Sequence, residues 1–322
     1  MARQMITVLG VCAAERRAYA RQLAAATVRR VVTVDPQGDG EEVSRAVERG
    51  DALVVELETD VEPAPLLDLV GDHVVCVVDA RHMFDDLRDL APLREGAPSG
   101  DPRGDVGARA RRAVGALECA HLIVLVEWQR SSTAELSMMM ALASHLNPRA
   151  RIRLSRGARA DLRASGVDEP VGAWRDRAGW VHALNAEHDP YMTDPRVRTL
   201  RYEQLRPFHP ERLVHALDEL ESGRFGVLVR SVGLCRLATR PGVLARWEQV
   251  GSAMWIDPLE QDESWLTIGQ ELALIGIDLQ EPRIASALDG AALTDDELAA
   301  GPASWSTFDD PLPAWPARID ER

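Results

Sequence analysis

The feature that most constrains the fold is an alternation, in the first half of the chain, between short apolar runs and helical patterns. The apolar runs are Met5–Leu9, Val31–Val34, Ala52–Leu57, Val74–Val78 and Leu122–Val126. The helical patterns are Arg16–Ala26, Gly40–Arg49 and Ser131–His145. Strands buried on both faces are apolar throughout, and in α/β proteins they alternate with helical crossovers. The sequence therefore predicts an α/β domain with a parallel sheet.

The pattern changes near residue 197. Strand-like segments are Thr199–Leu205, Trp247–Ile256 and Glu271–Leu279, and helical ones are Pro210–Glu221 and Pro282–Leu288. Phe225–Leu237 alternates in the manner of a hairpin or a twisted strand pair. Neighbouring strands backed by two helices predict a second, smaller α+β domain. We expect a first domain over residues 1–160, a connector over 161–196 and a second domain over 197–322, with a surface loop at Arg94–Asp105.

The chain contains no lysine. All 37 of its basic side chains are arginine, and 51 acids give a net charge of −14. This composition excludes a phosphate-loop lysine, a Schiff-base lysine and the lysine of a guanine-reading motif. It also means that any contact with nucleic acid must come from a local patch of charge.

One such patch is an arginine stripe: Arg149, Arg151, Arg153, Arg156, Arg159 and Arg163. Asp161 is the one acid in this stretch, whereas the final 66 residues hold 15 acids and 3 arginines. The stripe could bind the phosphates of RNA or of a nucleotide. The commoner explanation of such a pattern is a solvated helix or loop face.

The four cysteines are isolated and lack metal-ligand spacing: Cys12, Cys76, Cys119 and Cys235. This predicts buried thiols in a reducing cytosol and no metal site built on cysteines. The longest apolar runs are too short to cross a bilayer, so we expect a cytoplasmic protein with no membrane span.

The turn Gly10–Arg17, with the sequence GVCAAERR, stands where an α/β protein carries a phosphate-binding loop. Such a loop needs glycines whose amides close on the phosphates, a lysine, and a hydroxyl for magnesium. Gly10 is the one glycine of the turn. The chemistry of a phosphate cradle is therefore missing from the sequence.

At this turn the chain resembles the CobW family, relatives of the metallochaperone GTPases that serve urease and hydrogenase. The family loop is GxxGAGKTT, and a gapless alignment places Ala13 and Glu15 at glycines, Arg16 at the lysine and Arg17 at the hydroxyl. We expect the Glu15 carboxylate to point into the cradle and to repel a phosphate. Arg16 and Arg17 could still hold a phosphate, but ordinary exposed positions on the first helical turn are the expectation we favour.

Of four further family motifs, one is kept and three are altered or lost. ETSGLADPAP corresponds to Glu56–Pro65, which keeps the glutamate and the final Pro-Ala-Pro, and VVDA corresponds to Val77–Ala80. The guanine-reading LNKTD corresponds to Leu125–Gln129, where asparagine, lysine and aspartate are all absent. The metal-binding GCxCC has no counterpart, because its region is reduced to Pro36–Gly40.

The second half resembles the family more closely. Arg206–Leu213 reads RPFHPERL, Leu237–Pro241 reads LATRP, and Leu293–Glu297 begins the closing segment of the CobW C-terminal domain. Gly179–Val181 and Glu187–His188 resemble the subgroup of ribosome-hibernation-factor-recruiting GTPases, which are actinobacterial proteins linked to zinc limitation. The resemblance implies a P-loop-NTPase-like parallel sheet followed by a smaller α+β CobW C-terminal domain.

These motifs define the candidate site residues. A degenerate nucleotide site would comprise Gly10, Arg16, Arg17 and Glu56. A partner surface would comprise Arg149, Arg151, Arg153, Arg156, Arg206, Phe208, His209 and Arg212. A structural role at a helix start is the simpler interpretation of His209, because it has no cysteine, aspartate or second histidine beside it.

The resemblance and the losses together predict a non-catalytic pseudo-GTPase adaptor. The implied partner is the small ribosomal subunit or a hibernation-promoting factor under zinc shortage, with rRNA phosphates on the arginine stripe and with no DNA partner. No cofactor is expected and catalysis is not expected. The alternative is a divergent nucleotide-hydrolysing metallochaperone for zinc or cobalt, which would require GTP and magnesium.

Overall fold

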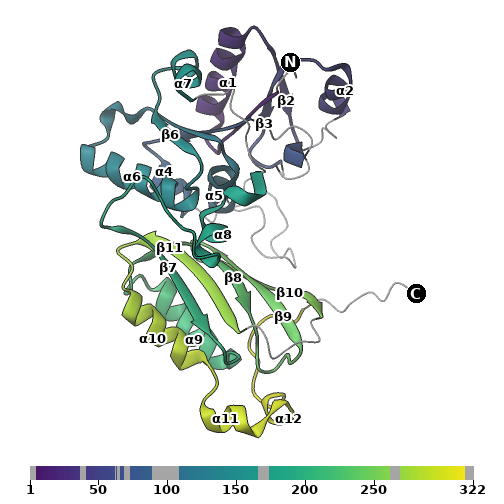
Figure 1. Ribbon diagram of the computed structural model, residues 1–322, viewed down its shortest axis with the longest axis vertical. Helices are drawn as coiled ribbons and strands as arrows, with labels where there is room; N and C mark the ends of the chain where they lie inside the picture. Colours follow the sequence, from purple (N-terminus) through teal and green to yellow (C-terminus); the bar gives the residue numbers. More distant parts are fainter. Residues whose placement is uncertain are drawn as a thin grey trace. The chain divides into compact units, whose positions relative to one another are not determined.

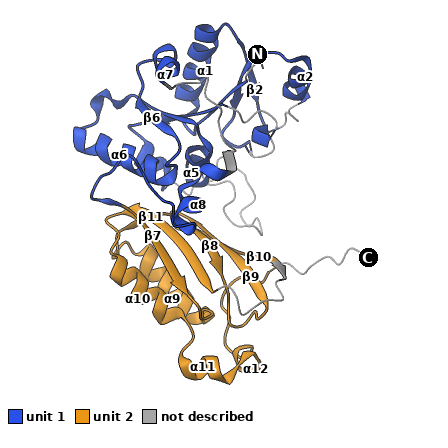
Figure 2. Ribbon diagram, viewed as in Figure 1, with its two compact units in different colours: residues 1–197 blue, residues 198–322 orange. Residues whose placement is uncertain are grey.

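The computed structural model describes residues 5–36, 41–61, 63, 66–68, 73–88, 109–165, 174–261 and 269–315. The chain divides into two compact units, residues 1–197 and 198–322 (Figure 2). The predicted loop Arg94–Asp105, most of Pro36–Gly40, and Glu62, Ala64 and Pro65 of the aligned second motif lie outside the described residues.

The first unit is built on a six-stranded sheet with the strand order β2-β3-β1-β4-β5-β6 (Figure 1). The strands are β1 (Ile6–Leu9), β2 (Arg30–Val34), β3 (Leu53–Leu57), β4 (Val74–Asp79), β5 (Leu122–Val126) and β6 (Arg151–Leu154). Every neighbouring pair is parallel. The predicted α/β fold with a P-loop-NTPase-like parallel sheet is therefore confirmed.

Helices connect these strands. They are α1 (Ala13–Thr27), α2 (Glu41–Arg49), α4 (Met83–Asp86), α5 (Arg109–Cys119), α6 (Thr133–Leu146), α7 (Ala158–Ser165) and α8 (Gly179–Leu184), with 3₁₀ turns η1 (Trp128–Arg130) and η2 (Trp174–Arg177). Tyr19, Ala20 and Leu23 of α1 are buried against the central strands. Because β1 lies between β3 and β4, the carboxyl ends of these three strands meet at one edge of the sheet, which is where α/β proteins place their sites.

The second unit has a five-stranded sheet in the order β10-β9-β8-β11-β7. The strands are β7 (Val197–Gln204), β8 (Val227–Cys235), β9 (Val243–Val250), β10 (Ala253–Gln261) and β11 (Gln270–Ile277). The helices are α9 (Pro210–Glu221), α10 (Glu281–Ala291), α11 (Asp295–Ala300) and α12 (Pro302–Trp305). Phe208 and Trp247 have no exposed surface and lie in the core of this unit. The unit is thus the smaller α+β domain that the sequence predicts.

Some predicted boundaries are wrong. Phe225–Leu237 contains the single strand β8, and the hairpin lies between β9 and β10, where Gly251 adopts a φ of 58°. The described parts of the predicted connector belong to the first unit, with α7 packed on α1. Helix α1 begins at Ala13, three residues before the predicted start. Within the described residues, no helix is long and apolar enough to cross a membrane.

Candidate functional site

The candidate site lies at the carboxyl end of β1, where the chain turns into α1. Gly10 has a φ of +144°, and a Cβ at this position would lie 2.3 Å from the carbonyl oxygen of Val77 on β4. The turn therefore requires glycine in order to pass beside the neighbouring strand. It is only three residues long, because Cys12 already serves as the N-cap of α1.

The residues that replace the loop glycines lie inside the helix. Ala13 and Glu15 belong to the first turn of α1, and the Arg16 amide donates to the Cys12 carbonyl as an intrahelical bond of 3.0 Å. Alanine favours helix, whereas glycine in these places would favour an open loop. The sequence change therefore converts the expected phosphate loop into helix.

The Arg16 side chain occupies the space beneath this turn. It is 1% exposed, and its Nε donates to the Glu56 carboxylate at 2.8 Å. Its Nη1 donates to the Gly10 carbonyl at 2.6 Å and to the Thr59 hydroxyl at 2.7 Å. Glu56 is 2% exposed and also accepts a bond of 2.9 Å from the Thr33 hydroxyl. The prediction of an exposed Arg16 is therefore wrong, because the guanidinium lies in a buried ion pair.

Arg17 lies at the surface, as expected for a residue on the first helical turn. Its side chain is 46% exposed and its Nη2 lies 2.7 Å from a carboxylate oxygen of Glu58, while its Nε lies 3.7 Å from Glu56. The two arginines thus join the start of α1 to the end of β3. Gly10, Arg16, Arg17 and Glu56, which the aligned motifs single out, lie in one place, where they contact one another and the neighbouring Thr33, Glu58 and Thr59.

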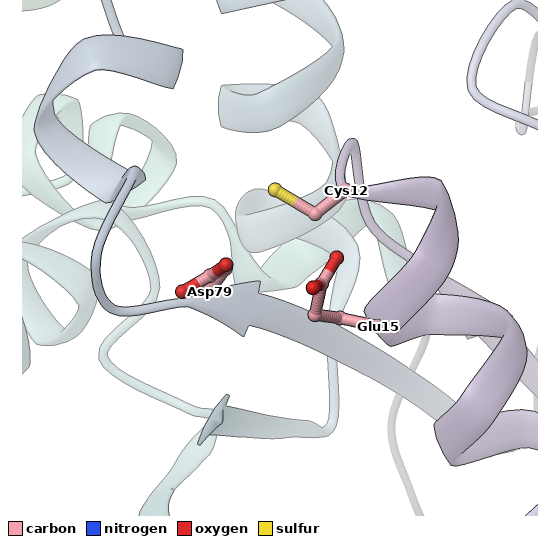
Figure 3. Close-up of side chains that lie close together, drawn as sticks. All are labelled: Cys12, Glu15 and Asp79. Carbon is pink, nitrogen blue, oxygen red and sulfur yellow. The ribbon is translucent and has the colours of Figure 1, made fainter. Parts of the chain in front are cut away.

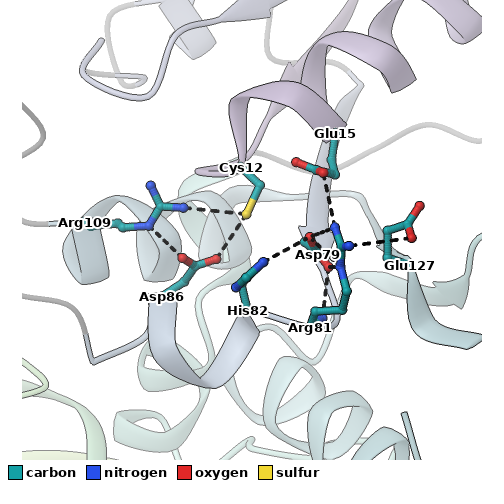
Figure 4. A network of polar contacts seen from close by, with 8 residues as sticks. All are labelled: Cys12, Glu15, Asp79, Arg81, His82, Asp86, Arg109 and Glu127. Atoms are coloured by element: carbon teal, nitrogen blue, oxygen red, sulfur yellow. Dashed lines mark hydrogen bonds and ion pairs between the residues drawn. The ribbon is translucent and has the colours of Figure 1, made fainter. Parts of the chain in front are cut away.

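A second polar network lies at the end of β4 (Figure 4). Arg81 binds Asp79 through both carboxylate oxygens, with Nη2 at 2.7 Å and Nε at 3.1 Å. Its guanidinium also lies 3.4 Å from Glu15 and 4.0 Å from Glu127. Burial would raise the pKa of Asp79, but the hydrogen bonds from Arg81 outweigh burial and lower it. Arg81 supplies the positive charge of this network.

Glu15 lies beside two residues that also line a cavity at Gly10. Its carboxylate lies beside Asp79 and Cys12 (Figure 3). The Cys12 thiol is 3.3 Å from Asp86, and Arg109 donates to Asp86 at 2.6 Å. Burial, followed by the charge of Asp86, raises the pKa of Cys12 to about 12, so this thiol is protonated at neutral pH.

Cys12, Glu15 and Asp79 form the one described group of three that could hold a metal ion, with ligand atoms all within 4.8 Å of one another. A sulfur and two carboxylates are donors that zinc accepts. In this structure, however, the thiol is protonated and Asp79 is paired with Arg81. A cation would have to displace the Arg81 guanidinium from Asp79 and the proton from the thiol.

The described residues do not fit a guanine nucleotide with magnesium. Two cavities that are lined by described residues and contact Gly10 have volumes of about 20 Å³ and about 30 Å³, which is room for about one water each. At the position of the guanine-reading motif, Glu127 begins the turn η1 and Trp128 donates from its indole nitrogen to the Ser155 carbonyl at 2.9 Å. No asparagine or aspartate stands there to read guanine.

In the second unit, the segment Arg206–Leu213 proves to be structural. Phe208 is completely buried, so the prediction that it contacts a partner is wrong. His209 is 9% exposed, is the N-cap of α9 and stacks on Phe308 with ring centroids 4.6 Å apart. Burial lowers the pKa of His209, and its Nδ1 has no hydrogen-bond partner. A role at the helix start therefore describes His209 better than partner binding does. The side chain stacks on Phe308 there and makes no capping hydrogen bond.

Two arginines of the same segment bind helix α11 and the residues just before it. Arg212 forms an ion pair of 2.7 Å with Glu297 and donates to the Ala292 carbonyl at 2.9 Å. Arg206 pairs with Asp295 and donates to the Leu293 carbonyl at 3.2 Å. These bonds anchor α11 and give both residues a role in the fold of this unit, while the side chains of Arg206 and Arg212 remain 37% and 32% exposed.

The Arg212–Glu297 pair predicts a dependence of stability on pH. Hydrogen bonds from Arg212 lower the pKa of Glu297 from 4.5 to about 2. Because the folded-state pKa is depressed, the pair stabilises fully above pH 4.5, and this contribution is lost as the pH falls towards 2. Arg212→Met is expected to lower the free energy of unfolding by about 1–2 kcal/mol at pH 7 and by less at pH 3.5. Urea unfolding at the two pH values measures the difference.

Arg206→Met is the control for that experiment, because Asp295 is 85% exposed and such a pair contributes about 1 kcal/mol or less. A deficit in Arg212→Met that is equally large at both pH values would contradict the role of the Glu297 carboxylate.

The arginine stripe begins at Arg149 in the turn before β6 and continues along β6, the turn that follows it and α7, all in the first unit. Arg149, Arg151, Arg156, Arg159 and Arg163 are exposed and Arg153 is half-buried. The stripe is therefore a real surface feature, separate from the cradle.

The fold and the site define a class: an α/β unit with a parallel sheet, in which a buried arginine pairs with a glutamate beside the turn after β1, followed by an α+β unit. Residues 197–292 match the family described as the cobalamin synthesis protein cobW C-terminal domain. This match covers strands β7 to β11 and helices α9 and α10 of the second unit.

Two curated proteins and one solved structure are similar to the chain. The chain is 27% identical over 223 residues to zinc-regulated GTPase metalloprotein activator 1 of Dictyostelium discoideum, covering 61% of this chain and 46% of that protein. It is 28% identical over 311 residues to a zinc chaperone of Mycobacterium tuberculosis, covering 82% and 72% of the two chains. The zinc-bound YjiA GTPase from E. coli is 13% identical, with a TM-score of 0.37 and coverage of 91% and 100%. The match thus spans less than half of the Dictyostelium protein.

Proposed function

We propose that this chain is a non-catalytic CobW-family adaptor in zinc handling, which acts by binding a partner and not by hydrolysing a nucleotide. The observation that carries the proposal is the Arg16 side chain, which is 1% exposed and bonded to Glu56, Gly10 and Thr59. A guanidinium with these partners is unavailable to a triphosphate. The zinc context is taken from the names of the two relatives described above, a zinc-regulated activator and a zinc chaperone.

The partner we propose is the small ribosomal subunit or a hibernation-promoting factor that acts under zinc shortage. This choice follows the resemblance of Gly179–Val181 and Glu187–His188 to the hibernation-factor-recruiting subgroup. The acidic end of the chain, with 15 acids and 3 arginines in the final 66 residues, would suit a basic ribosomal or hibernation protein. Complementary charge of this kind favours association and selects against like-charged partners.

A second candidate function is zinc or cobalt chaperoning by a nucleotide-hydrolysing enzyme. The observation that favours it is the convergence of Cys12, Glu15 and Asp79, whose donor atoms lie within 4.8 Å of one another. The protonated thiol and the Arg81–Asp79 pair oppose metal binding there. We therefore prefer the adaptor.

Two measurements on the full chain test the adaptor. Phosphate release from GTP with magnesium is expected to equal that of buffer alone. Co-sedimentation with small ribosomal subunits from zinc-starved cells is expected to be the same with and without GTP. GTP turnover that Arg81→Ala changes would support the enzyme instead, and a chain that stays in the supernatant under all conditions would overturn the proposed partner.

A further inference from the structure

Five of the six residues in the arginine stripe lack the acidic partners that several other exposed arginines of the first unit have. Arg30 pairs with Glu42, Arg45 pairs with Glu41, and Arg49 lies 3.0 Å from Asp51. In the part of the chain that the structure describes, the guanidinium groups of five stripe residues form no ion pair: Arg149, Arg153, Arg156, Arg159 and Arg163.

Asp161, the one acid within the stripe, does not compensate it. Its side chain is completely buried and accepts hydrogen bonds from the Tyr19 hydroxyl at 3.2 Å, the Ser155 hydroxyl at 2.7 Å and the Arg156 amide at 3.0 Å. These bonds fix α7 to α1 and to the end of β6. The carboxylate is therefore used inside the fold, while the arginines that surround it in sequence remain in solvent.

Two pairs of stripe residues each share one face of a strand or helix. Arg151 and Arg153 are two residues apart on β6, so they share one face of the sheet at a spacing of about 7 Å. Arg159 and Arg163 are four residues apart on α7 and share one helical face at about 6 Å. Gly157, with a φ of +95°, lets the chain turn from the strand directly into the helix. Each of these two pairs suits a ligand whose anionic groups also repeat.

The backbone of β6 is not available for strand addition, although β6 is an edge strand. The Tyr191 hydroxyl accepts from the Ile152 amide at 2.7 Å and donates to the Ala150 carbonyl at 2.9 Å. A peptide that paired with this edge would have to displace Tyr191. The stripe therefore offers its side chains, which favours a ligand recognised through charge.

The stripe also lacks the means to bind unpaired bases. Residues 149–165 include no aromatic side chain. Proteins that bind single strands stack bases on aromatic rings, whereas duplex RNA is recognised largely through its phosphates and shape. Arginine also suits phosphate because its planar fork donates two hydrogen bonds to one group.

We propose that the arginine stripe binds the backbone phosphates of duplex RNA. The net charge of −14 does not prevent this, because exposed charges farther apart than about 8 Å are largely screened at physiological salt. The choice of RNA over DNA rests on the proposed function, whereas the choice of duplex phosphates rests on the stripe alone.

The test is fluorescence anisotropy with the full chain and a labelled 20-base-pair RNA of mixed sequence, over a series of salt concentrations. The main variant is Arg156→Ala/Arg159→Ala/Arg163→Ala. The matched control is Arg30→Ala/Arg45→Ala/Arg49→Ala, which removes the same charge from exposed, acid-paired positions of the same unit. A lysine version of the main variant keeps the charge and separates electrostatics from structure.

We expect the logarithm of affinity to fall with the logarithm of salt with a slope of about −3 to −5, corresponding to four to six contacted phosphates. The main variant should reduce the magnitude of that slope by about 3, since each phosphate contact contributes about 1, and should bind at least about tenfold more weakly at 0.1 M salt. The lysine version should keep the wild-type slope. The control should bind within about twofold of the wild type.

Several results would overturn the proposal. They are absence of binding to the RNA duplex, an unchanged slope in the main variant, an equal loss in the control, and tighter binding of a DNA duplex of the same sequence. A poly-glutamate competitor that matches RNA per negative charge would assign the stripe to an acidic protein instead. RNA binding can fail while GTP turnover remains absent, so the failure of this inference is distinguishable from the failure of the non-catalytic role.

Discussion

Arg16→Met is expected to lower the free energy of unfolding by about 3–5 kcal/mol, because it leaves the Glu56 carboxylate buried without its main partner. Glu56 is 2% exposed, and the bond from Thr33 and the more distant Arg17 are all that would remain to it. Urea unfolding followed by circular dichroism measures the loss. Hydrogen exchange of β1 and β3 amides locates it in the first unit.

Two further variants show whether the buried pair is the cause. Arg17→Ala removes a guanidinium that is 46% exposed and should cost about 1 kcal/mol or less. Adding Glu56→Gln to Arg16→Met removes the uncompensated charge and should recover part of the lost stability. A loss below about 1 kcal/mol in Arg16→Met, or no recovery in the double variant, would mean that Arg16 is not held in the cradle as described.

Phe208→Ala is expected to lower the free energy of unfolding of the second unit by about 3–5 kcal/mol, because it empties a fully packed position. Phe208 has no exposed surface, and its ring lies between those of Tyr202 and Trp247, with centroids 6.5 Å and 6.2 Å away. Its amide and carbonyl also join Arg236 and Ala238 through bonds of 2.9 Å each. Urea unfolding, with separate transitions fitted for the two units, measures the effect.

Leu205→Ala, three residues away, is the control. Leu205 is 88% exposed, so its truncation should change the stability by no more than about 0.5 kcal/mol. Equal effects of the two variants would contradict the core position of Phe208, and would restore the interpretation of that residue as a partner contact.

The central strands could be predicted from sequence because burial on both faces requires apolar residues throughout, as in Leu122–Val126. The edge strand β6 could not be, because the sequence Arg-Ile-Arg-Leu has one buried residue and three that meet solvent in part. Alternation of apolar and polar residues over Phe225–Leu237 is the same for one long strand as for two short ones, so the sequence does not distinguish the single strand β8 from a hairpin. Helix α1 starts early because Ala13 and Ala14 are helix formers that a loop alignment treats as loop.

The sequence locates the candidate site, but it does not show which contacts the side chains make there. Aligned motifs identify Gly10, Arg16, Arg17 and Glu56, which lie together in the fold. They do not show that the arginine at the lysine position turns inward to Glu56, since that pairing spans 40 residues. Thr59 and Arg81 were missed. Arg81 directly follows the aligned Val77–Ala80. Its place two residues after Asp79 is the sequence signal that could have identified it as a partner of that carboxylate.

Titration calorimetry of the full chain with GTP and magnesium tests the central claim most directly. If the Arg16 guanidinium and the short Gly10 turn fill the cradle, no heat of binding will appear at millimolar nucleotide. A one-to-one, magnesium-dependent isotherm with a micromolar dissociation constant would show that a triphosphate enters the cradle and would contradict this account.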